Sequence, residues 1–182
     1  LTELTWWVVL LHLGLAESVV ACMTVALVFG WNAGGETTGG EVGNRETLWF
    51  DLLVVCALLS TFALVLSGSY MVGLGYGLVC STWPLCRGSV LPEGGASLVH
   101  MAHRFAAVFV GVLIVGTALS AWSHRTRDPR MFWVAFLAAC IFVAQTMVGA
   151  GLVWFGFAVS LRAVHLVMAT LLWVSVVTLV AL

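Results

Sequence analysis

Long apolar segments separated by short polar ones dominate the sequence. The apolar runs lie at 4–31, 48–72, 98–122, 131–153 and 159–182. Each is long enough to cross the hydrocarbon core of a bilayer, which takes about 20 such residues in a helix. The pattern therefore predicts an all-α integral membrane protein with five transmembrane helices. Composition agrees, because 62% of the residues are hydrophobic and only 8% are charged, too few to cover a soluble surface.

Charge near the ends of these segments predicts their orientation. The turn at 123–130 contains Arg125, Arg127 and Arg130, and by the positive-inside rule it faces the cytoplasm. The acidic linker at 32–47 falls on the same side, but acidic residues contribute little to orientation. We expect a multi-pass protein of the cell (inner) membrane, with the segment between the second and third helices outside. A net charge of −1 and the lack of a basic tract argue against a nucleic-acid partner.

Histidines inside the predicted helices are the main candidate chemistry. Imidazole is rare in hydrocarbon and usually functional there. His12, His103 and His165 each lie a turn or two from the outer end of a helix, at ~1.5 Å of rise per residue, so their depths are similar. Two such residues on different helices can bind a haem iron from opposite sides. The alternative is that these side chains bond neighbouring backbone carbonyls.

The first and last helices share a pattern. His-Leu-Gly-Leu-Ala at 12–16 aligns with His-Leu-Val-Met-Ala at 165–169, and the apolar pattern continues beyond it. We interpret 1–31 as the last helix of a first, incomplete four-helix unit. The glycine-rich segment 32–47 is then a cytoplasmic linker, and 48–182 is a complete four-helix unit. The chain starts at Leu1 rather than Met, and we expect it to be part of a longer or trimmed protein.

Three further polar residues are candidates for chemistry. His100 shares a helical face with His103. It either donates a hydrogen bond to a carboxylate or relays a proton there, or it is an interfacial residue at the end of the helix. Arg104 either matches a carboxylate geometrically or extends to lipid headgroups. Glu17 is an acid within the first helix, where burial is expensive. Glu17 is thus a catalytic candidate, unless pairing with a helix of the absent unit explains it.

The cysteines divide into two groups. Cys80 and Cys86 lie in the outer loop, where an oxidising compartment favours a disulfide. Such a short ring contributes about 2 kcal/mol through loop entropy, and either a structural or a redox role remains open. The other three, Cys22, Cys56 and Cys140, lie within helices and are assigned no chemistry.

Three motifs together resemble the haem A synthase family. They are Gly-Ser-Tyr-Met-Val-Gly-Leu-Gly-Tyr-Gly-Leu-Val-Cys-Ser-Thr-Trp-Pro-Leu-Cys at 68–86, His-Met-Ala-His-Arg at 100–104, and Gln-Thr-Met-Val-Gly at 145–149 before His165. The resemblance covers 48–182 and the first helix. Family members look like two tandem four-helix units, each with a histidine on its second and fourth helices.

The resemblance implies a function. It implies oxidation of the C8 methyl group of haem O to the formyl group of haem A, with a haem b cofactor held by His103 and His165. His12 would then be an iron ligand in the substrate unit, and Arg104 a contact of the bound haem. Substrate-handling units in the family often carry a glutamate where His100 stands here. The unit at 48–182 is therefore assigned to the cofactor.

The partners and the alternatives follow from the same comparison. Besides the lipid bilayer, the resemblance implies haem O synthase and cytochrome oxidase assembly factors as partners, and it leaves a homo-oligomer or a larger membrane complex open. A first alternative is a non-catalytic haem-b subunit of a respiratory or photosynthetic complex. A second is a membrane thiol oxidoreductase that uses Cys80 and Cys86. The second alternative leaves the intramembrane histidines unexplained.

Overall fold

The computed structural model describes residues 5–32, 45–125 and 129–182, and this part of the chain is helical apart from its connections. The helices are α1 (Trp6–Asn32), α2 (Arg45–Gly73), the short 3-10 helix η1 (Tyr76–Leu78), α3 (Gly95–His124), α4 (Pro129–Trp154) and α5 (Val159–Ala181). All five α-helices are long and apolar enough to cross a membrane. Helices suit lipid because they satisfy their own backbone hydrogen bonds. The predicted all-α membrane fold is thus confirmed.

The helix bounds differ from the predicted ones mainly at their polar ends. α1 extends to Asn32 and α2 begins at Arg45, so both helices enter the segment that we predicted as a linker. The glycine-rich residues 33–44 lie outside the described residues. The division of the chain into 1–31, 32–47 and 48–182 therefore stays a prediction.

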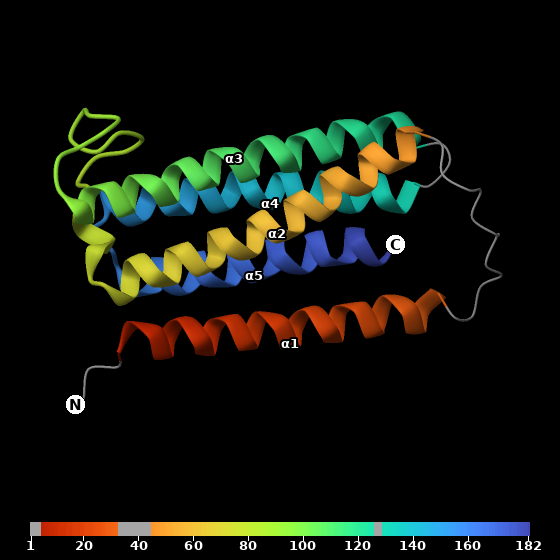
Figure 1. The fold of residues 1–182 in the computed structure, drawn as a ribbon, viewed down its shortest axis with the longest axis horizontal. Helices are drawn as coiled ribbons and strands as arrows, with labels where there is room; N and C mark the ends of the chain where they lie inside the picture. The colour runs from red at the N-terminus through yellow and green to blue at the C-terminus, as the bar shows by residue number, and fades with distance from the viewer. Residues whose placement is uncertain (1–4, 33–44, 126–128) are drawn as a thin grey trace.

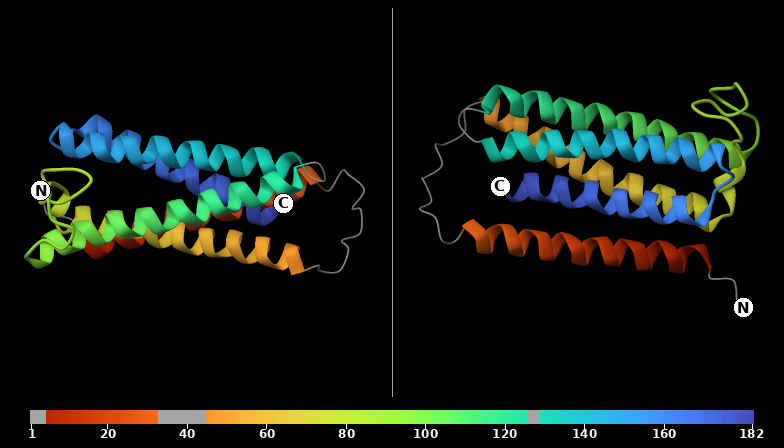
Figure 2. Two further views of the ribbon diagram at one scale, coloured as in Figure 1. Left: turned by 90° about the horizontal axis from the view of Figure 1, so that it is seen from above. Right: turned by 180° about the vertical axis from the view of Figure 1, so that it is seen from behind.

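α2, α3, α4 and α5 form an antiparallel bundle, and α1 lies along one side of it (Figures 1 and 2). Each bundle helix packs against the next one along the chain, and α2 closes the ring against α5. α3 and α5 are therefore diagonal to each other. α1 contacts α2 and α5. We call the end that carries residues 74–94 the loop end; α1 begins at this end and α5 ends at the other (Figure 1).

A buried carboxyl group attaches α1 to the bundle. The side chain of Glu17 is only 3% exposed. Thr170 of α5 donates its hydroxyl hydrogen to Oε1 of Glu17 at 2.7 Å, and Nε1 of Trp173 donates to the Glu17 carbonyl oxygen at 2.8 Å. Glu17 therefore has partners in α5, while its Oε2 is buried without a partner among the described residues, so pairing with a helix of an absent unit stays a prediction. Burying a carboxyl group in the membrane costs free energy, and Glu17 offsets part of this cost by linking α1 to α5.

Replacing Thr170 with valine should weaken this attachment. The substitution keeps the shape of the side chain and removes the donor to Glu17, so we expect the free energy of unfolding in detergent micelles to fall by about 1 kcal/mol. Thr178→Val is the matched control, because the Thr178 hydroxyl bonds only the Val174 carbonyl of its own helix, at 2.8 Å. Equal losses in the two variants would contradict a specific role for the Glu17 contact.

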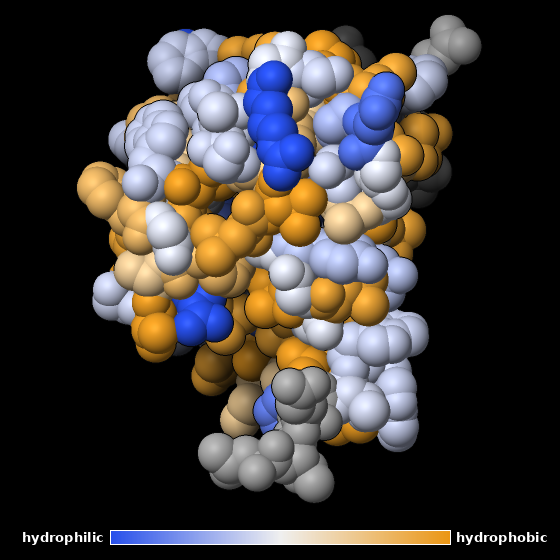
Figure 3. All heavy atoms as spheres, turned by 90° about the vertical axis from the view of Figure 1, so that its left-hand side faces the viewer, coloured by the Kyte–Doolittle hydropathy of each residue, from blue (hydrophilic) through white to orange (hydrophobic). Residues whose placement is uncertain are grey.

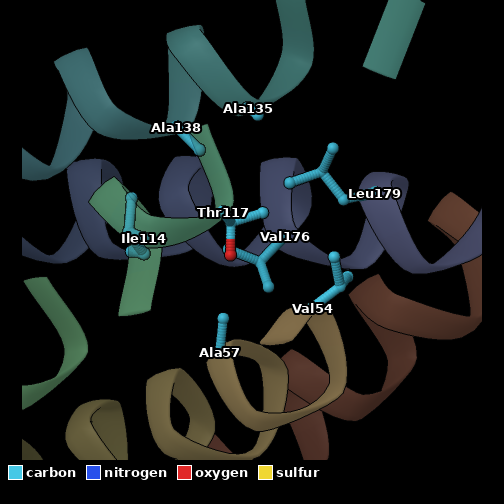
Figure 4. A pocket seen from close by; sticks show the side chains of 8 residues that line it. All are labelled: Val54, Ala57, Ile114, Thr117, Ala135, Ala138, Val176 and Leu179. Atoms are coloured by element: carbon cyan, nitrogen blue, oxygen red, sulfur yellow. The ribbon is translucent and has the colours of Figure 1, made fainter. Parts of the chain in front are cut away.

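The half of the bundle away from the loop end is closely filled. Figure 4 shows side chains from all four bundle helices, among them Val54, Ile114 and Leu179, converging on one small space. Its volume is about 10 Å³, which is about the minimum for a single water molecule. Its one hydroxyl group, that of Thr117, donates to the Leu113 carbonyl oxygen at 2.8 Å. This part of the core therefore has no room for a bulky ligand.

Candidate functional site

His103 of α3 lies against the α2 backbone in the half of the bundle nearer the loop end. A Cβ atom built on Gly68 would be 3.1 Å from Cε1 of this imidazole. Ser67 Oγ is 2.7 Å from His103 Nδ1, and the same hydroxyl donates to the Leu64 carbonyl oxygen at 2.7 Å. A hydroxyl has one hydrogen to donate, so Ser67 accepts from Nδ1–H. Nε2 of His103 is thereby left with its lone pair, as a metal ligand requires.

His165 of α5 has a similar setting on the opposite side of the bundle. A Cβ atom on Gly149 of α4 would be 3.2 Å from its Cε1. Gln145 Nε2 donates to the His165 carbonyl oxygen at 2.9 Å. Within the described residues, His165 Nδ1 and Gln145 Oε1 are buried without a hydrogen-bond partner. Buried polar atoms are nearly always paired, and three other side-chain atoms of the described residues, in Glu17, Thr61 and Ser69, are unpaired as well.

The two histidines thus come from diagonal helices, and each rests on a glycine of the preceding helix. A groove of about 490 Å³ between α2 and α3 reaches His103, and its polar side chains are those of Ser60, Ser67 and Tyr70. Its volume is in the range of ordinary ligand sites, ~300–1,000 Å³. The arrangement offers two imidazoles, close backbone approach and space on the His103 side.

His100 and Arg104 face the loop. His100 is 4% exposed, and its Nδ1 is 3.1 Å from the Tyr76 carbonyl oxygen. Arg104 Nη2 is 3.2 Å from His100 Nε2, while Nη1 donates to the carbonyl oxygens of Thr82 and Pro84, each at 2.8 Å. Arg104 is therefore held by the loop at two points and by His100 of its own helix at a third. A contact of Arg104 with a bound haem stays a prediction.

The loop is compact and covers one side of this end of the bundle. Cys80 and Cys86 form a disulfide with a Cα–Cα distance of 4.8 Å, and they are 1% and 0% exposed. They pack on Met101 of α3. The ring of Phe157, from the α4–α5 turn, lies where a side chain on Gly77 would be, 2.6 Å from a Cβ built there. Figure 3 looks onto this end, where hydrophilic side chains stand among apolar ones.

His12 is not brought into this site. It is exposed on α1, and no hydrogen bond joins it to another of the described residues. Glu17, the other candidate on α1, faces α5 as described above. The structure therefore groups His103, His165, His100 and Arg104 and leaves His12 on an outward face of α1.

Several residues of the site carried no assigned role in the sequence. Ser67 sets the imidazole of His103, and Gln145 holds the backbone of His165. The only signal for them is position, since each lies within four residues of a glycine that contacts the same histidine. Gln145 does stand in the motif at 145–149 that carries the family resemblance, whereas sequence alone gives no reason to prefer Ser67 over other serines in the helices.

The fold and the site define an integral membrane helical bundle with two histidines on diagonal helices, in the half nearer the loop end. Residues 2–177 match the family model of the cytochrome oxidase assembly proteins, and the chain belongs to that family. This confirms the resemblance noted in the sequence.

Curated relatives give the same family. The chain is 30% identical over 133 residues to a protein of Shouchella clausii named heme A synthase, with 71% of this chain and 44% of the relative covered. Proteins of the same name from Alkalihalophilus pseudofirmus and Bacillus licheniformis are 29% and 27% identical, over 70% and 76% of this chain. The matched regions cover 44% and 46% of those two relatives, so the chain spans about half the length of these proteins.

Proposed function

We propose that the α2–α5 bundle holds one haem b between His103 and His165, as the cofactor-binding unit of a haem A synthase. The observation that carries this is the pair of imidazoles on diagonal helices, each pressed against a glycine. Diagonal placement lets the two rings approach an iron from opposite sides of a porphyrin plane. The glycines bring each ring close to a neighbouring backbone without a steric cost.

The residues present fit a haem in three respects. His103 offers a free Nε2 because Ser67 occupies its Nδ1, and a ligating histidine usually has its other ring nitrogen held in this way. His165 Nδ1 is buried without a partner, so this ring is not committed to another group. The groove beside His103 is lined by α2 and α3 alone, and it makes this ring accessible from one side of the bundle.

The chain's own residues would orient and enclose the cofactor. Ser67 fixes the tautomer and rotation of His103, and Gln145 fixes the backbone at His165. The apolar walls of the bundle exclude water from both rings. A haem with two histidine ligands supplies electron transfer, because it has no open position for oxygen.

The reaction of the whole protein goes further than this bundle. Oxidation of the C8 methyl group of haem O would occur at a second haem site, to which His12 would contribute a ligand from the outward face of α1. Haem O synthase and cytochrome oxidase assembly factors are the partners that this reaction would require. The loop end would lie on the outer side of the cell membrane.

Haem analysis of the purified protein tests the proposal. We expect the pyridine haemochrome spectrum to show haem b, and the EPR spectrum of the oxidised protein to be that of a low-spin bis-histidine haem. Haem O or haem A beside it would support the synthase activity. A wild-type protein that contains no haem after expression with sufficient haem supply would overturn the proposal.

A non-catalytic haem-b subunit is the second candidate, and the surroundings of His100 favour it. Both nitrogens of His100 are within hydrogen-bonding distance of other groups, and no carboxylate stands at that position. Incubating the protein with haem O, oxygen and a reductant distinguishes the two functions. Haem A, or its alcohol precursor, in the chromatogram of extracted haems supports the synthase, and unchanged haem O supports the electron-transfer subunit.

A thiol oxidoreductase fits the structure poorly. The reactive sulfur of such an enzyme must be reached by its partner thiol, whereas Cys80 and Cys86 are almost completely buried. The free cysteines among the described residues lie within helices and offer no second pair near them.

A further inference from the structure

We propose that the ring closed by Cys80 and Cys86 binds the guanidinium group of Arg104 through its backbone carbonyl oxygens, and that His100 holds Arg104 in this position. Arg104 and His100 would act as positioning residues for His103, without touching the haem themselves. Only the effect on His103 rests on the function proposed above, because the contact between loop and helix exists without a ligand.

The disulfide ring presents two acceptors to one guanidinium nitrogen. The carbonyl oxygens of Thr82 and Pro84 both belong to residues inside the ring, and both accept from Arg104 Nη1 at 2.8 Å. Two carbonyls converge on one nitrogen only when the chain between them is bent and held. The disulfide supplies this constraint, with the hydrogen bonds from Thr82 Oγ to the Leu85 carbonyl and from the Arg87 amide to Thr82 Oγ.

His100 completes the contact through its tautomer. Arginine can only donate, so Nε2 of His100 must accept from Arg104 Nη2. Nδ1 then carries the hydrogen and donates to the Tyr76 carbonyl oxygen. His100 is therefore a neutral bridge between the start of the loop and the guanidinium. With one acceptor before the ring and two inside it, Arg104 and His100 bind the loop at Tyr76, Thr82 and Pro84.

The residues that bind the loop lie on both sides of His103, the proposed iron ligand, in the sequence of α3. His100 and Arg104 are one helical turn apart on the same face, and His103 lies between them in sequence. Holding both residues fixes the rotation of this turn about the helix axis. The direction of the His103 ring toward Ser67 and Gly68 depends on that rotation. The loop would therefore act on the site through the backbone of α3.

The same geometry assigns His100 a role that differs from proton transfer. A proton relay needs partners that release and accept protons, but the partners of His100 are a guanidinium, which stays protonated, and a backbone carbonyl oxygen. The buried sulfur atoms likewise fit a constraint on the ring better than a redox exchange. Loop, disulfide and the two basic residues thus form one mechanical unit.

Hydrogen exchange and EPR on a set of five variants test the proposal. Arg104→Gln and Cys80→Ala/Cys86→Ala should each speed exchange of the Cys86 and Ser89 amides by about tenfold or more, because hydrogen bonds to a charged group are lost. Their combination should add little, since both changes break one contact. Arg87→Gln is the control, because Arg87 Nη2 bonds the Val79 carbonyl of the same loop, outside the ring, at 3.1 Å.

The haem provides the second measurement. In the haem-loaded protein, Arg104→Gln and the double cysteine variant should shift the EPR g values in the same direction, and Arg87→Gln should leave them unchanged. Arg104→Lys should behave like Arg104→Gln, because an ammonium group lacks the planar fork that reaches three acceptors. Full rescue by lysine, or additive effects of the two changes, would overturn the proposal. If the wild type binds no haem, the exchange rates still test the contact between Arg104 and the disulfide ring.

Discussion

Alanine at His165 or at His103 will remove low-spin haem from the purified protein. Each substitution deletes one of two proposed axial ligands, and His165 has no neighbouring imidazole on α5 that could replace it. Loss of a residue that merely supports a metal ligand often costs ~10–100-fold in metal affinity, so loss of the ligand itself should cost at least that much. We expect haem content to fall by more than about tenfold in each variant, measured by pyridine haemochrome per mole of protein.

The control must be a substitution inside the same bundle that leaves the site intact. Cys140→Ala on α4 serves, because the thiol is free and exposed on the outside of the bundle. It should keep full haem content and an unchanged EPR spectrum. His12→Ala should also keep the haem held by His103 and His165, since His12 lies on an outward face of α1. Retention of a low-spin signal in both His103→Ala and His165→Ala would exclude these residues as the ligand pair.

The membrane fold could be predicted from the sequence because it depends on averaged properties. Twenty or so apolar residues in a row leave a helix as the only economical structure in lipid. The histidines could be identified for a similar reason, because an imidazole is conspicuous in an apolar segment. Neither inference needs to know which side chains touch.

The parts that could not be predicted depend on rotation and reach. Whether Arg104 extends to a carboxylate, to lipid or to the loop depends on the path of residues 74–94, and apolar periodicity does not specify that path. The partner of Glu17 could not be predicted because it requires the rotation of α1 against α5. Small rotations of either helix would separate Glu17 from Thr170 without changing any sequence pattern.

The histidine pair also shows a regularity inside the four-helix unit. In the pair α2–α3 and again in the pair α4–α5, the imidazole of the second helix packs against a glycine of the first. A Cβ atom built on that glycine would be 3.1 Å from Cε1 in the first pair and 3.2 Å in the second. The supporting polar residues differ, because Ser67 bonds the ring in one half and Gln145 bonds the backbone in the other. The shared element is therefore the close approach of ring and backbone. We infer that this approach is the feature on which ligation depends most directly.

Filling either glycine should accordingly disable the site while the bundle stays folded. In Gly68→Val and Gly149→Val the new Cβ would stand 3.1–3.2 Å from an imidazole carbon, and the added methyl groups come closer still. The ring must rotate away, because the α2 and α4 backbones are held by their own helices. We expect haem content to fall by about tenfold or more, with a stability cost of about 1–3 kcal/mol from overpacking. Absorption spectra and thermal unfolding of the same samples measure both quantities.

Gly116→Val separates the specific effect from the general one. Gly116 is on α3 with His103, and a Cβ built on it would meet nothing within 4 Å. The variant therefore adds the same side chain to the same kind of helix without touching a histidine, and it should bind haem like the wild type. Gly68→Ala gives an intermediate case, since His103 can yield a few tenths of an ångström and keep its iron with altered EPR g values. If Gly68→Val bound haem as well as Gly116→Val does, Gly68 would be a helix-packing residue only. His103 would then have to reach the iron from another direction.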